Sequence, residues 1–194
     1  MSDRFDPQAY GPRVAAILGE IRVAPLGSGS VAPAVRSLLQ SFNPHSDLGQ
    51  PVTDSDAARA CYSGLWLLHD GLDESHAISQ DLPTSEGSLW HAIMHRREPD
   101  ASNAKYWWRR VGPHPVLDQL KERAPTLGYF FTTPQDFVDL CEQVRGVGNP
   151  QEELARRVQT LEWQLLFHWC YRKAVNPDLA NPERNRQGRG EPEA

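Results

Sequence analysis

Histidine and carboxylate side chains recur at helical spacing in two neighbouring stretches of the sequence. Each stretch has two imidazoles and one carboxylate at successive intervals of four and three residues: His69, Asp73 and His76 in the first, and His91, His95 and Glu98 in the second. Residues at these intervals lie on one face of an α-helix. If the two helices pack against each other, the two faces bring imidazole nitrogens and carboxylate oxygens together.

Such a set of side chains suits a divalent transition metal, because imidazole nitrogens and carboxylate oxygens are ligands for zinc, iron and manganese. The sequence contains neither HExxH nor ExxH, so this prediction depends on the repeated spacing alone. The predicted metal ligands are His69, Asp73, His76, His91 and His95. Glu162, His168 and His114 are further candidates whose position the sequence leaves open.

Two alternatives use the same residues without a metal. In the first, His69, Asp73 and His91 are catalytic, because a carboxylate that fixes the tautomer of a histidine prepares it for acid–base chemistry near neutral pH. In the second, the histidines are structural and form hydrogen bonds across a helix interface. The protein would then be a non-catalytic, ligand- or protein-binding helical module. The sequence does not decide between an enzyme and such a module.

A basic and aromatic segment follows the second histidine pair. Arginine offers paired donors to a carboxylate or phosphate, and tryptophan offers a flat apolar face. We therefore predict that this segment binds an anionic or hydroxylated small molecule through Arg96, Arg97, Asn103 and Trp107. The simpler interpretation is that its positive charge pairs with the acidic stretch that precedes it.

The rest of the pattern is helical, with apolar residues every three or four positions and with capping residues, proline or glycine at the boundaries. We predict an all-α fold: a single compact domain of about seven helices over residues 1–175 and a disordered tail over residues 176–194. The histidines fall on predicted helices at 57–79 and 85–98, since a lone glycine such as Gly71 need not stop a helix. The other predicted helices cover residues 12–20, 34–42, 101–111, 115–123, 133–145 and 150–175.

Composition narrows the class of protein. The 194 residues carry a formal net charge of −5 with neutral histidines, which argues against a nucleic-acid partner. No apolar run approaches the ~18 residues of a membrane span, and the start of the chain lacks the apolar core of a signal peptide. Three widely spaced cysteines form no disulfide framework. We therefore predict a soluble, cytoplasmic protein with no membrane partner, and the composition also allows a homo-oligomer.

Overall fold

A computed structural model describes residues 5–19, 23–176 and 178 of the chain. Within these residues it contains nine α-helices and two short 3-10 helices but no strands, so the prediction of an all-α fold is confirmed. The predicted tail over residues 176–194 falls, apart from residues 176 and 178, outside the described residues. Its boundary with the domain stays a prediction.

Proline and short polar residues begin most of the helices. Side chains of Asp54, Thr84, Asp100, Thr133 and Asn149 each accept a hydrogen bond from a backbone N–H three residues further on, which satisfies an otherwise unpaired donor. The elements are η1 (Pro7–Tyr10), α1 (Pro12–Leu18), α2 (Pro33–Gln40), α3 (Ser55–Leu68), α4 (Leu72–Ser79), α5 (Ser85–Arg97), α6 (Ala101–Val111), α7 (Pro115–Arg123), η2 (Ala124–Leu127), α8 (Pro134–Val144) and α9 (Pro150–Val175).

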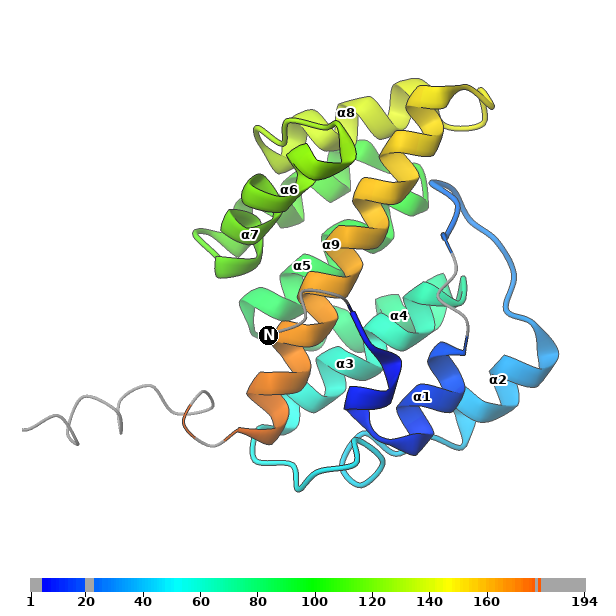
Figure 1. Cartoon of the computed structure of the whole chain (residues 1–194), viewed down its shortest axis with the longest axis vertical. Coiled ribbons are helices and arrows are strands. Elements are labelled where there is room, and N and C mark those ends of the chain that lie inside the picture. The colour runs from blue at the N-terminus through cyan, green and yellow to red at the C-terminus, as the bar shows by residue number, and fades with distance from the viewer. Residues whose placement is uncertain (1–4, 20–22, 177, 179–194) are drawn as a thin grey trace, which may run out of the picture.

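The longest helix, α9, organises the others (Figure 1). It packs along α3, while η1 and α1 lie beside its C-terminal half and α8 beside its N-terminal half. Helices α4, α5 and α6 pack against one another in chain order, with α5 in the middle. No helix in the described part of the chain has both the length and the apolar character needed to cross a membrane.

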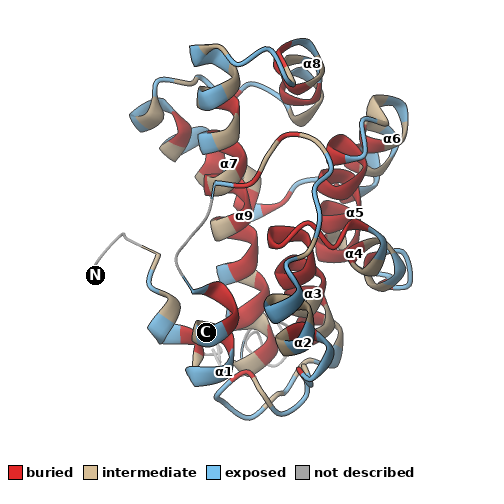
Figure 2. Cartoon of the chain, turned by 90° about the vertical axis from the view of Figure 1, so that its right-hand side faces the viewer, coloured by how far each residue is buried: buried red, intermediate tan, exposed pale blue. Residues whose placement is uncertain are grey.

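Helix α5 is buried along almost its whole length, although its sequence is polar (Figure 2). The indole of Trp90 packs directly on Gly64 of α3. A Cβ added to Gly64 would lie only 2.6 Å from that ring, so the close contact between the two helices requires glycine there. The carbonyl of Gly64 also accepts a hydrogen bond of 2.8 Å from the indole of Trp163 in α9. The helix that carries His91 and His95 is thus held tightly between two neighbours.

The charged residues of α5 are buried with partners. Arg96 is fully buried and lies 2.5 Å from Glu162 of α9. Arg97, also buried, pairs with Asp70 and donates to the carbonyl of Leu67 at 2.5 Å. Buried charges are tolerated when they are paired and hydrogen-bonded in this way. Both arginines therefore connect α5 to its neighbours.

The predicted helix at 57–79 is wrong as a single element, because the chain breaks between α3 and α4. Asp70 adopts a left-handed conformation with φ of 67°, and the N–H of Gly71 donates to the carbonyl of Trp66 at 2.9 Å. This hydrogen bond pattern ends a helix. The next residue, Gly71, must be a glycine because a Cβ at this position would lie 2.6 Å from the Trp66 ring. This break, which the sequence did not reveal, divides one predicted helix into two; the described residues form nine α-helices, against about seven predicted.

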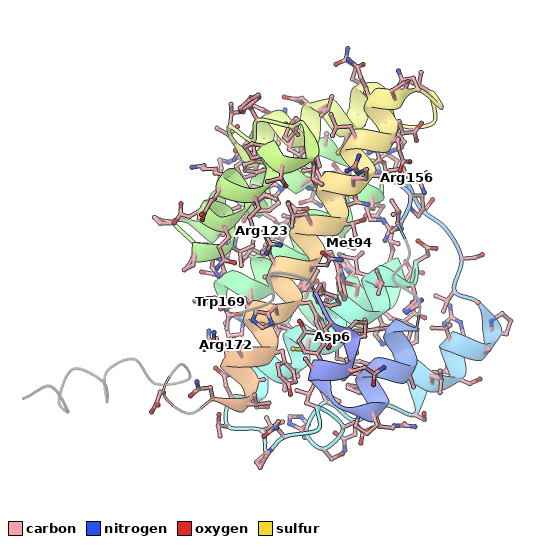
Figure 3. All side chains as sticks on the ribbon, viewed as in Figure 1. Asp6, Met94, Arg123, Arg156, Trp169 and Arg172 are labelled. Atoms are coloured by element: carbon pink, nitrogen blue, oxygen red, sulfur yellow. The ribbon has the colours of Figure 1, made fainter. Side chains whose placement is uncertain are left out.

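Glu86, in the first turn of α5, is the centre of a second buried polar group. It accepts hydrogen bonds from Trp169 at 2.9 Å and Lys173 at 3.0 Å, both near the C-terminal end of α9, where Figure 3 labels Trp169. The ring of His114 lies 3.7 Å away. Burial alone would raise the pKa of Glu86, but these three neighbours together hold it well below its usual value of 4.5.

We expect Glu86→Gln to destabilise the protein by roughly 1–3 kcal/mol at pH 7, the usual cost of a lost charged hydrogen bond. A carboxylate with a lowered pKa in the folded state stabilises the fold above its unfolded pKa and loses this effect as the pH falls. The difference in unfolding free energy should therefore shrink below about pH 4.5. Urea unfolding of both proteins at several pH values measures this, and a difference independent of pH would contradict it.

Candidate metal centre

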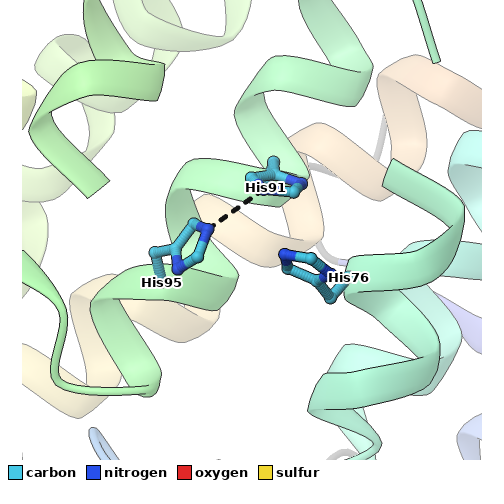
Figure 4. A group of neighbouring side chains, drawn as sticks. All are labelled: His76, His91 and His95. Atoms are coloured by element: carbon cyan, nitrogen blue, oxygen red, sulfur yellow. Dashed lines mark hydrogen bonds between the residues drawn. The ribbon is translucent and has the colours of Figure 1, made fainter. Parts of the chain in front are cut away.

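Three histidines from two helices converge in the space between α4 and α5. The rings of His76 in α4 and of His91 and His95 in α5 turn toward one another (Figure 4). One possible ligand atom from each ring lies within 4.8 Å of those of the other two. His91 and His95 are buried, whereas His76 is half-buried. These residues, which we call the histidine cluster, form a group that can hold a metal ion.

The two histidines of α5 are in direct contact. Their Nε2 atoms face each other at 3.0 Å. Each imidazole nitrogen has either a proton or a lone pair, so two of them approach this closely only with a proton or a metal ion between them. The interval of one helical turn between His91 and His95 produces this contact.

The other nitrogen of each ring is held by a polar neighbour. The Nδ1 atom of His91 lies 2.9 Å from the hydroxyl of Ser79, and Nδ1 of His95 lies 3.0 Å from a carboxylate oxygen of Glu98. Histidines that bind metals use one nitrogen for the ion and bond the other to a carboxylate, carbonyl or water, which fixes the orientation of the ring. Both rings of α5 have this arrangement.

The third ring, that of His76, has no hydrogen-bonding partner in the part of the chain that the structure describes. Its centroid lies 4.5 Å from that of His91 and 5.4 Å from that of His95. Nitrogen ligands of a tetrahedral zinc ion, bonded at about 2.0–2.1 Å, lie roughly 3.3 Å apart. The α5 pair is already near this spacing, and a ligand atom of His76 lies within 4.8 Å of both.

Burial favours the neutral form of His91 and His95, which is the form that binds a metal ion. Burial and the neighbouring His95 and His76 lower the pKa of His91 to about 3. Burial also lowers the pKa of His95, although Glu98 opposes the shift. Metal ligands must be neutral imidazoles, so these shifts spare the site most of the competition with protons at pH 7.

Comparison with known proteins does not identify a metal site to which these histidines correspond. The chain matches no family model, no curated protein and no solved structure. The functional assignment therefore depends on the geometry of the cluster.

Helix α6 covers the cluster with two of the predicted substrate-binding residues. The side-chain amide of Asn103 lies 3.1 Å from Nε2 of His95. The half-buried ring of Trp107 lies 4.1 Å from that of His91, measured between centroids. Both residues thus lie beside the position where an ion would sit.

The structure does not bring His69 and Asp73 to the cluster. The break at Asp70 leaves His69 at the end of α3, on a different helix from His76, whereas Asp73 lies on α4 with His76. The Nε2 atom of His69 instead lies 2.8 Å from the carbonyl of Ile17. Asp73 is exposed and lines a different, acidic groove. Among the described residues, neither belongs to the group that can hold a metal.

Arg96 and Arg97, the other predicted substrate-binding residues, lie away from any surface. Their exposed fractions are 0% and 1%, and their guanidinium groups face Glu162 and Asp70. A ligand could not reach them without displacing these partners. In this structure both arginines hold helices together.

The remaining candidates also lie elsewhere. Glu162 is the buried partner of Arg96, and His114 lies against Glu86 and Trp169. Nδ1 of His168 lies 3.1 Å from the hydroxyl of Tyr10, on the other side of α9. None of the three joins the histidine cluster.

Ser79 is a functional candidate that sequence reasoning missed. It holds His91 from α4, and its interval of three residues from His76 was the one available signal. A serine in a short helix is too common for that interval to predict a partner twelve residues further on.

Proposed function

We propose that the protein is a zinc-dependent hydrolytic enzyme whose metal is bound by His76, His91 and His95. One observation carries this proposal: a third imidazole, without a hydrogen bond to any described residue, faces a pair of imidazole nitrogens that lie only 3.0 Å apart. A shared proton explains a pair of imidazoles, whereas three converging imidazoles match the ligand set of a metal ion.

The donor set favours zinc over the other metals that the sequence suggested. All three ligands are neutral nitrogens, and Glu98 is engaged with Nδ1 of His95 rather than aimed at the ion. Manganese prefers carboxylates and water, and the common iron site of oxygenases has two histidines and one carboxylate. Imidazole ligands in a tetrahedral arrangement suit zinc.

The number of ligands favours catalysis. Structural zinc ions are closed by four protein ligands, whereas catalytic zinc ions have three and keep one position for water or substrate. When bound, such an ion supplies Lewis acidity and lowers the pKa of coordinated water to about 7. The amide of Asn103 lies 3.1 Å from Nε2 of His95, the nitrogen that would bind the ion, so a bound metal would have to displace it.

Titration of the metal-free protein with Co²⁺, a spectroscopic substitute for zinc, tests the proposal. We expect one equivalent to bind with the strong visible absorption of a tetrahedral ion, and zinc to displace it. The zinc protein should hydrolyse an activated ester such as 4-nitrophenyl acetate, and chelation should remove this activity. Absence of stoichiometric binding would overturn the proposal and favour structural histidines; binding without hydrolysis would overturn the enzymatic part.

The carboxylate of Glu98 should increase the affinity of the histidine cluster for a metal ion. We expect Glu98→Gln to weaken cobalt binding by about 10-fold or more, since loss of an outer partner of a ligating histidine typically costs 10–100-fold in affinity. Glu122→Gln, which changes an exposed glutamate of α7, is the matched control and should bind cobalt normally. Equal affinities in the two variants would exclude this role for Glu98.

A further inference from the structure

An open groove lies next to the histidine cluster on the side of Trp107. Its volume is about 600 Å³, and the loop between α4 and α5 forms one wall. Side chains of α5 and α6 form the rest, and the polar and aromatic members of the lining are Gln80, Asp81, Thr84, Ser85, Ser88, Trp107 and Arg110. None of the three histidines lines the groove, but Trp107 contacts both the groove and His91, so the groove adjoins the cluster.

Arg110 presents a positive charge in this groove. Its guanidinium carbon lies 5.1 Å from the centre of the Trp107 ring and 5.9 Å from that of Tyr106. Contacts of this kind with aromatic rings hold a guanidinium in place, and here one donor, Nη1, also forms a long hydrogen bond of 3.4 Å to the hydroxyl of Tyr106, which leaves the other donors for a ligand. Arg110 is exposed and forms no ion pair with any residue in the described ranges. A chain of ring contacts thus connects His91, through Trp107, to a pre-positioned cation.

Ser88 adds a second polar group to the groove. It is 7% exposed, lines the groove, and its hydroxyl makes no hydrogen bond to any residue that the structure describes. The hydroxyl oxygen is not among the buried side-chain atoms that lack a partner, so it is accessible from the groove and can hydrogen bond with a ligand there. Ser88 lies three residues before His91 and seven before His95, so all three share one face of α5. The hydroxyl therefore lies between the groove and the cluster.

The charges in the groove indicate which anion it takes. Arg110 is the one cationic side chain in the lining, and the exposed Asp81 stands among the same residues. A single guanidinium neutralises a carboxylate and matches its two oxygens. With Asp81 in the same lining, a bound carboxylate leaves one negative charge uncompensated, whereas a phosphate dianion leaves two. The lining thus favours a carboxylate.

We propose that the enzyme acts on small carboxylic acids, with the free carboxylate bound by Arg110 and Ser88 while the reacting group faces the metal at His91 and His95. This inference rests on the proposed function and names its substrate class. The role of binding an anionic substrate, which the sequence predicted for Arg96 and Arg97 of α5, is thus assigned to Arg110 of α6.

Competition between carboxylates on the cobalt-loaded protein tests the inference. Acetate can occupy only the open metal position, whereas a dicarboxylate of suitable length also reaches Arg110. Among succinate, glutarate and adipate, we expect at least one to perturb the cobalt spectrum at a concentration about 10-fold below that of acetate, which corresponds to ~1.4 kcal/mol. Arg110→Ala should abolish this advantage without changing the affinity for acetate, and Ser88→Ala should reduce it.

Arg109→Ala is the matched control, because Arg109 is exposed on the same helix and does not line the groove. It should keep the advantage of the dicarboxylate. Normal cobalt binding with no dicarboxylate better than acetate, or with the advantage intact in Arg110→Ala, would overturn the inference and leave the proposed function standing. Failure of cobalt binding in the unaltered protein would overturn both.

Discussion

Replacing His91 by alanine should abolish stoichiometric metal binding. His91 is central to the cluster, because its ring contacts those of His76, His95 and Trp107. Its removal leaves two histidines, one of them half-buried and without its nearest neighbour. We expect the affinity for Co²⁺ to fall by at least about 100-fold, more than the loss of an outer partner causes.

The matched control is His45→Ala, because His45 is exposed in the loop before α3. It should bind one equivalent of cobalt with the unaltered spectrum. His76→Ala should retain weak binding at the α5 pair, with a changed spectrum. Cobalt affinity in His91→Ala within a few-fold of that of His45→Ala would contradict the assignment of the cluster.

Replacing Glu162 by glutamine should cause the largest loss of stability. The change leaves the guanidinium of Arg96 charged and unpaired in the core, where that residue is fully buried. Breaking a buried pair on one side typically costs 3–5 kcal/mol, which for a chain of this size lowers the unfolding midpoint by roughly 10 °C. Thermal and urea unfolding at pH 7 measure the effect.

The exposed pair of Lys105 and Asp139, 2.5 Å apart, is the control. Asp139→Asn should change the unfolding free energy by less than about 1 kcal/mol, because solvent screens exposed pairs. The double variant Arg96→Met with Glu162→Met removes both charges and should be more stable than Glu162→Gln. Equal losses in the buried and exposed single variants would show that burial of the Arg96 pair has no energetic consequence.

Local signals explain which parts of the fold the sequence predicts. Thr84 and Asp100 are capping residues whose hydrogen bonds reach only three residues, so the starts of α5 and α6 follow from short patterns. The contact between His91 and His95 is equally local, since one helical turn separates them. The prediction of a helix carrying both histidines on one face is therefore independent of the rest of the fold.

Distant contacts explain what the sequence cannot predict. The break at Asp70 accompanies an ion pair with Arg97 and close packing against Gly29, which lie 27 and 41 residues away in the chain. The burial of Arg96 likewise depends on Glu162, far along the sequence. The sequence around an arginine on a predicted helix does not show whether its guanidinium pairs with a buried carboxylate or binds a substrate.

The break between α3 and α4 has a further consequence for how a metal would act on the protein. It leaves His76 on a separate helix of eight residues, whereas His91 and His95 lie on α5, which packing already fixes. Helices this short are marginal without external contacts. A ligand that binds only the assembled site stabilises that assembly by mass action. The ion would therefore act as a cross-link, and the backbone amides of α4 would gain the most protection from hydrogen exchange.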